Sequence, residues 1–134
     1  MPYKTPDGAC LPVGFPKFSK NFMNVKEITE GVYYAGVNDR VTALFEGLWP
    51  IPEGVSYNSY IVKGENGTAL IDTVRIDEVR EFLDNISRIQ DGKPIDYLVI
   101  NHMEPDHSGS IPEVVRAYPD VKIVGNVQTI GMIK

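Results

Sequence analysis

Four side chains of metal-ligand type stand close together in one short segment. His102, Glu104, Asp106 and His107 lie within His102-Met103-Glu104-Pro105-Asp106-His107, which holds both histidines of the 134-residue chain. Imidazole and carboxylate groups are the ligands that zinc, iron and manganese take in proteins. If the segment is extended, His102, Glu104 and Asp106 point the same way as alternate residues, and a turn at Asp106-His107 could direct the His107 ring at a second ion. The spacing therefore predicts a metal site, against the simpler interpretation of a solvated polar turn.

The elements before and after this cluster predict where it lies. The apolar run from Ile95 to Asn101 indicates a buried strand, and Ser110-Ile111-Pro112-Glu113 is typical of a capped helix start. In α/β proteins, ligands bind beyond the carboxyl ends of such strands. The cluster is therefore expected at that edge of a sheet.

A further acid, Asp72, follows the apolar run Ala69-Leu70-Ile71. If this strand neighbours the strand before the cluster, Asp72 reaches the same edge and can accept a hydrogen bond from a ligand histidine. A turn or a helix N-cap is the other interpretation of Asp72.

The remaining pattern predicts an α/β chain. Two hairpins are expected, one with a turn near Glu30-Gly31 and one over residues 57–73. Residues 76–89 carry an amphipathic pattern and predict a helix, and Asn126 is expected to cap another. The long connection over residues 38–56 either walls a site or covers a core edge.

At the N-terminus, residues 1–24 are rich in Pro, Gly, Lys and Phe and are interpreted as an irregular arm. Residues 25–134 form the predicted domain. Cys10 is the single cysteine and lies outside any metal-ligand spacing, so the sequence gives no sign of a disulfide.

Charge and hydropathy narrow the range of partners. The formal net charge of −5 argues against nucleic acid and against anionic membranes. The sequence also has no apolar run approaching the roughly 18 residues of a membrane span, and no signal peptide is expected, so a cytoplasmic location is predicted.

The combination of Leu70-Ile71-Asp72-Thr73, a helix, a second apolar strand and an HxExDH cluster resembles the metallo-β-lactamase superfamily. Hydrolases of that superfamily usually carry HxHxDH, and Glu104 at the third position resembles the flavodiiron proteins, or A-type flavoproteins. The segment Trp49 to Tyr60 is similar to theirs as well.

The resemblance implies an αββα metallo-β-lactamase-like fold, of which this chain is expected to hold the N-terminal half. It implies that His102 and Glu104 bind one iron, that Asp106 and His107 bind the other, and that Asp72 supports them. Flavodiiron proteins reduce dioxygen, nitric oxide or both with electrons from an FMN in a separate flavodoxin-like domain. Their further ligands, a His, a bridging Asp and a last His, lie downstream, and no His follows His107 here.

Three functions are therefore considered. The first is a fragment of a flavodiiron oxidoreductase, incomplete and inactive alone, with no catalytic residue assigned. The second is a fragment of a hydrolase of the same fold, with zinc as its metal. The third is a half-domain without enzymatic activity or metal that self-associates or binds a partner chain, because a half-fold leaves apolar surface uncovered.

Overall fold

A computed structural model describes residues 25–133 of the chain. The predicted N-terminal arm over residues 1–24, with Cys10, lies outside the described residues. Within the described part, no helix is long and apolar enough to cross a membrane.

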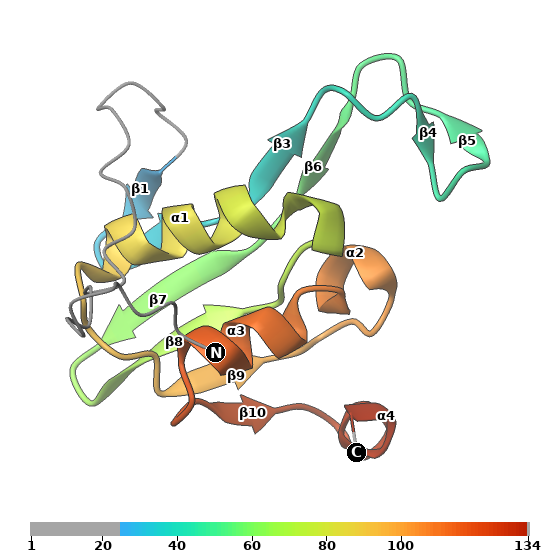
Figure 1. Cartoon of the computed structure of the whole chain (residues 1–134). Helices are drawn as coiled ribbons and strands as arrows, with labels where there is room; N and C mark the ends of the chain where they lie inside the picture. Colours follow the sequence, from blue (N-terminus) through green and yellow to red (C-terminus); the bar gives the residue numbers. More distant parts are fainter. Residues whose placement is uncertain (1–24, 134) are drawn as a thin grey trace, which may run out of the picture.

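The centre of the described chain is a mixed six-stranded sheet in the order β1-β2-β7-β8-β9-β10 (Figure 1). Neighbours from β1 to β8 pair antiparallel, whereas β8, β9 and β10 run parallel. Both predicted hairpins are confirmed, as is the parallel α/β unit that follows them. The strands are β1 (Lys26–Thr29), β2 (Val32–Tyr34), β7 (Tyr60–Gly64), β8 (Gly67–Ile71), β9 (Tyr97–Val99) and β10 (Lys122–Val124).

Helical segments connect the parallel strands. A 3-10 turn, η1 (Ile76–Glu78), leads into α1 (Val79–Gln90), and α2 (Pro105–Ser108) and α3 (Ile111–Ala117) follow β9. The predicted helix over 76–89 is confirmed, and it ends where Asp91 adopts a left-handed conformation with φ 49°. The final helix, α4 (Val127–Ile133), begins as predicted, since Asn126 Oδ1 accepts a hydrogen bond from the Thr129 N–H at 2.8 Å.

Helix α3 starts after Ser110 as predicted, but the capping hydrogen bond expected of Ser110 is absent. Ser110 makes no side-chain capping bond, and its hydroxyl donates instead to the Val74 carbonyl oxygen at 2.9 Å. The Ser110 side chain is buried, so its hydroxyl satisfies a carbonyl of the β8–α1 connection rather than the helix end.

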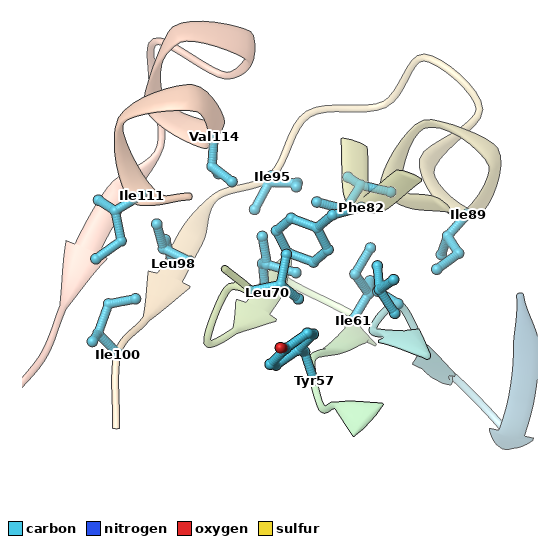
Figure 2. Close-up of a cluster of buried hydrophobic side chains, with 14 residues drawn as sticks. Tyr57, Ile61, Leu70, Phe82, Ile89, Ile95, Leu98, Ile100, Ile111 and Val114 are labelled. Atoms are coloured by element: carbon cyan, nitrogen blue, oxygen red, sulfur yellow. The ribbon is translucent and has the colours of Figure 1, made fainter. Parts of the chain in front are cut away.

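The core lies between the sheet and helices α1 and α3 (Figure 2). Successive residues of a strand face opposite sides of a sheet, and the register places one row of apolar side chains against the helices. This row meets Phe82 and Ile86 of α1 and Val114 of α3, all with no exposed surface. The row consists of Ile61, Leu70, Leu98 and Ile123.

The opposite face of the sheet is apolar as well, but less covered. The register places two further rows there, and Val62, Tyr97 and Val124 in them are exposed by 37%, 41% and 43%. We call these rows the open face. They contain Val32, Val62, Ala69, Tyr97 and Lys122, and Tyr34, Tyr60, Ile71, Val99 and Val124.

Residues 38–56 are not one irregular loop. They contribute to a narrow ribbon that projects from the sheet, with a small hairpin at its tip (Figure 1). Glu46 and Gly47 turn the hairpin with φ of 52° and 72°. The ribbon pairs β3 (Val37–Asp39) with β6 (Val55–Tyr57), and the hairpin pairs β4 (Leu44–Phe45) with β5 (Trp49–Pro50).

Candidate metal centre

The predicted ligand cluster follows β9, at the carboxyl edge of the parallel strands. β8 and β9 pair in parallel, with Ile71 opposite Val99, so the condition under which Asp72 reaches the edge of the cluster is met. Beyond the last paired residues, the Asn101 N–H donates to Asp72 Oδ1 at 2.7 Å. This bond ties the start of the cluster to the end of β8.

The cluster itself is half extended and half helical. Glu104 is extended, with φ −68° and ψ 154°, and Pro105 then starts the short helix α2, which contains Asp106 and His107. The expectation of an extended segment through Asp106 is therefore wrong. Proline has a fixed φ and no N–H, which suits the first helical position, and the His107 and Ser108 N–H groups both donate to the Glu104 carbonyl at 2.9 Å.

The helical turn nevertheless brings the predicted side chains together. His102 Nε2 lies 3.3 Å from Glu104 Oε2, and His107 Nε2 lies 3.5 Å from Asp106 Oδ2. The rings of His102 and His107 are 5.2 Å apart and nearly perpendicular. Ligand atoms of His102, Glu104 and Asp106 all lie within 4.8 Å of one another. We call these three residues the three-ligand group.

Asp72 is at the base of the same site. Its side chain is 11% exposed, and Oδ2 lies 3.6 Å from His107 Nδ1, beyond ordinary hydrogen-bonding distance. Its φ of 55° places it in the left-handed region, which aspartate tolerates better than most residues. Asp72 is thus positioned beside a candidate ligand, and its supporting role remains a prediction.

Thr73 fixes the backbone of the helical turn, a contact that the sequence analysis missed. The Thr73 N–H and its hydroxyl both donate to the His107 carbonyl oxygen at 2.8 Å. Thr73 is fully buried and also accepts a hydrogen bond from the Ser110 N–H at 3.3 Å. A threonine directly after the strand-end acid was the available signal, but its partner is 34 residues away in the sequence.

Two buried polar atoms in the site have no hydrogen-bond partner. They are Asp106 Oδ1 and His107 Nδ1. Unsatisfied buried groups cost free energy, and a coordinated cation would satisfy a carboxylate oxygen or a neutral ring nitrogen. The donor set of two imidazoles and two carboxylates matches iron, manganese or zinc, so the residues present fit a metal.

A pocket of about 250 Å³ opens beside the cluster. Its lining residues are Phe45 and Glu46 from the projecting hairpin, with Arg75, Pro105 and Asp106. This arrangement favours the interpretation of residues 38–56 as the wall of a site. Burial alone would lower the pKa of Arg75, but the nearby Tyr57 hydroxyl and the Asp77 carboxylate raise it, so the guanidinium stays charged at the pocket.

The chain resembles known proteins over most of its length. A sequence model of the metallo-beta-lactamase superfamily matches residues 52–129. Flavo-diiron protein FprA2 of Clostridium acetobutylicum is 35% identical over 100 residues, which are 75% of this chain and 25% of the relative. The nitric oxide reductase of Moorella thermoacetica is 32% identical over 108 residues, 80% of this chain and 27% of the relative.

Solved structures agree with this similarity. The rubredoxin oxygen:oxidoreductase of Desulfovibrio gigas superposes with a TM-score of 0.75 at 35% identity, over 81% of this chain and 27% of that structure. The predicted metallo-β-lactamase-like α/β fold is therefore confirmed for the part that the two share. The chain spans about a quarter of the length of the relatives that it matches.

Proposed function

We propose, since this chain belongs to the metallo-β-lactamase superfamily, that its cluster contributes to a di-iron site for the reduction of dioxygen, nitric oxide or both. It does so as part of the metallo-β-lactamase-like domain of a flavodiiron oxidoreductase. One relative is named a nitric oxide reductase and another an oxygen oxidoreductase. Our proposal extends these two activities to the domain of which this chain is a part.

The observation that carries the proposal is the pairing of the four side chains. His102 with Glu104, and His107 with Asp106, each place a ring nitrogen 3.3–3.5 Å from a carboxylate oxygen. Atoms at such a separation can bind adjacent positions of one ion, because metal–ligand bonds are about 2.0–2.2 Å long. Two such pairs in one segment support a site for two ions.

Glu104 supports iron over zinc. A carboxylate at this position, where hydrolases of the superfamily usually have histidine, adds a hard oxygen ligand and a negative charge, which favour the oxidised state of iron. A hydrolase with zinc, which binds water as a nucleophile, is the second candidate function. Glu104 weighs against it.

Two residues outside the cluster support the candidate ligand His107. Asp72 lies beside His107, and Thr73 fixes the backbone of His107 through two hydrogen bonds. When bound, a pair of irons supplies electrons and open coordination positions for a diatomic substrate. We assign no residue of this chain to FMN, which by the resemblance is held by a separate domain.

The open face supports association with another polypeptide surface. Val62, Tyr97 and Val124 are exposed on it, and large apolar patches on a protein surface mark interaction sites. We propose that a second copy or a partner chain covers this face. An acidic chain with a net charge of −5 gives no support for nucleic acid or an anionic membrane as that partner.

The test is the identity of the metal after anaerobic purification with iron and zinc offered together. Bound iron, with a change in visible absorption on oxidation, is the expected result. Bound zinc with esterase or lactonase turnover would replace the proposal by the hydrolase. If no metal binds, and His102→Ala and His107→Ala leave stability unchanged, a protein that only binds partners is the better description.

A further inference from the structure

We infer that Arg75 is a positioning residue, whose positive charge holds the β4–β5 hairpin in place as the wall of the pocket beside Asp106. This role goes beyond the proposed function, on which it rests only for the use of the pocket. Arg75 lies between β8 and η1, on the main body of the domain. It lines the pocket together with Phe45 and Glu46 of the hairpin, so it stands where the two parts meet.

The backbone of the hairpin is not attached to the main sheet. Within residues 25–133, β4 and β5 pair only with each other, at the far end of the ribbon that β3 forms with β6 (Figure 1). Leu48 and Trp49 of the hairpin are 72% and 65% exposed, so the burial of these side chains does not hold it either. A two-stranded hairpin alone is marginally stable in water. Its position therefore depends on inward-facing side chains, which are the partly buried Phe45 and the charged groups at the pocket.

Acids of the ribbon and of η1 repel each other near Arg75. Asp39 of β3 is only 4% exposed, and Glu78 belongs to η1. Burial, and then the negative charge of Asp39, raise the pKa of Glu78, so the two carboxylates disfavour each other. Asp77 and Glu81 add negative charge on the η1 side. Salt screens a buried charge poorly, so this repulsion would push the ribbon away from η1 if no cation offset it.

Arg75 supplies the offsetting charge to both sides. Its guanidinium bonds the Asp77 carboxylate of η1 at 2.5 Å. Toward the ribbon it lies near the hydroxyl of Tyr57, which is buried and makes no ordinary hydrogen bond. Burial alone would raise the pKa of Asp39, but hydrogen bonds within the ribbon, and then the charge of Arg75, lower it. A planar group with five N–H donors suits such contact with two elements at once.

Loss of this charge has a defined consequence for the pocket. Asp39 and Glu78 then repel each other without a cation between them, and Glu46 loses the opposite charge with which it shares the pocket. The hairpin should swing away from the body and open the pocket to water. The six-stranded sheet, which has its own ladder of hydrogen bonds, should stay closed.

The experiment is amide hydrogen exchange, followed by NMR, on the metal-free 134-residue chain. The amides of Leu48 and Ile51, both bonded within the hairpin at 3.0 Å, report its opening, and the Asp72 amide, bonded from β8 to β9 at 2.8 Å, reports the sheet. Arg75→Met should speed exchange in the hairpin by about tenfold or more and leave the sheet amide within about twofold. Arg80→Met, which removes the same charge from an exposed position of α1, should change neither.

Two further variants distinguish the charge of Arg75 from its packing. Arg75→Lys keeps the charge, and hairpin exchange should stay within about threefold of the parent chain. The double variant Arg75→Met/Glu78→Gln removes the repulsion together with the cation, so hairpin exchange should also return to within about threefold of the parent. Lost packing would not be restored by a change at Glu78. Arg75→Gln takes the place of Arg75→Met if far-UV circular dichroism shows that Arg75→Met does not fold.

Unchanged hairpin exchange in Arg75→Met would overturn the inference. So would equal acceleration of the hairpin and sheet amides, or a double variant that exchanges as fast as Arg75→Met. None of these measurements involves a metal, so failure of the proposed function, which the metal test decides, is distinct from failure of this role of Arg75.

Discussion

Replacement of Asp72 tests how the end of β8 holds the candidate site. Asp72 Oδ1 accepts the Asn101 N–H at 2.7 Å, and the residue has a φ of 55° with 8% of its surface exposed. Asp72→Ala removes a charge-assisted hydrogen bond worth about 1.5–3 kcal/mol. It also places alanine in the left-handed region, at a cost of about 1–2 kcal/mol. We expect a loss of about 3 kcal/mol in the free energy of unfolding.

Two further variants separate these contributions. Asp72→Asn keeps an oxygen acceptor and tolerates the left-handed backbone, so it should lose only about 1 kcal/mol. Asp72→Gly removes the acceptor but relieves the backbone, so it should be more stable than Asp72→Ala by about 1 kcal/mol.

The assay is urea unfolding of the metal-free chain followed by far-UV circular dichroism, with the slope of the transition compared among variants. Equal stability of Asp72→Ala and Asp72→Asn would refute the role of the hydrogen bond. Equal stability of Asp72→Ala and Asp72→Gly would refute the backbone contribution.

Three more perturbations follow from the packing and the charges. Gly36→Ala should prevent folding, because its Cβ would lie 2.1 Å from the Tyr57 carbonyl oxygen, whereas Gly47→Ala meets no atom within 4 Å and should cost about 1 kcal/mol. Phe82→Ala empties a fully buried position between the sheet and α1, and should cost about 3–5 kcal/mol in urea unfolding. Burial alone would raise the pKa of Asp39, but hydrogen bonds to its carboxylate hold the pKa below the ordinary 3.8. The contribution of Asp39 to stability is therefore complete above pH 3.8 and is lost as the pH falls through the lower folded-state pKa. Unfolding curves measured at a series of pH values should show a smaller loss in Asp39→Asn, which has no carboxylate at this position to protonate.

Each of these has a result that would contradict it. A folded Gly36→Ala would mean that β3 and β6 can separate by more than an ångström. A loss below about 1 kcal/mol in Phe82→Ala would mean that the core collapses around the gap. An unchanged acid transition in Asp39→Asn would remove that carboxylate from the acid stability of the protein.

Local patterns in the sequence were sufficient for most of the elements. The amphipathic period over residues 76–89 predicted α1, because the stripe must face a core whatever the rest of the fold. Turn residues predicted both hairpins, and the capping preference of Asn126 predicted the start of α4. The ligand types of the cluster and its place after a strand are likewise properties of a few adjacent residues.

Errors arose where a distant segment competes for a local group. Ser110 has the sequence of a cap, yet its hydroxyl bonds the Val74 carbonyl, 36 residues away. The connection over residues 38–56 has no periodicity, but it pairs with itself into a ribbon whose tip lines the pocket beside Asp106. Propensities describe a segment in isolation, and these partners exist only after folding.

The sequence by itself determined which side chains can bind a metal and which strand precedes them. Only the tertiary structure decided how they meet, because the parallel pairing of β8 with β9 places Asp72 3.6 Å from His107 across 35 residues of sequence. The turn at Pro105 then brings Asp106 next to His102 and Glu104. Ligand type is a property of single residues, whereas the distance between ligands depends on strand register and backbone angles that the whole sheet imposes.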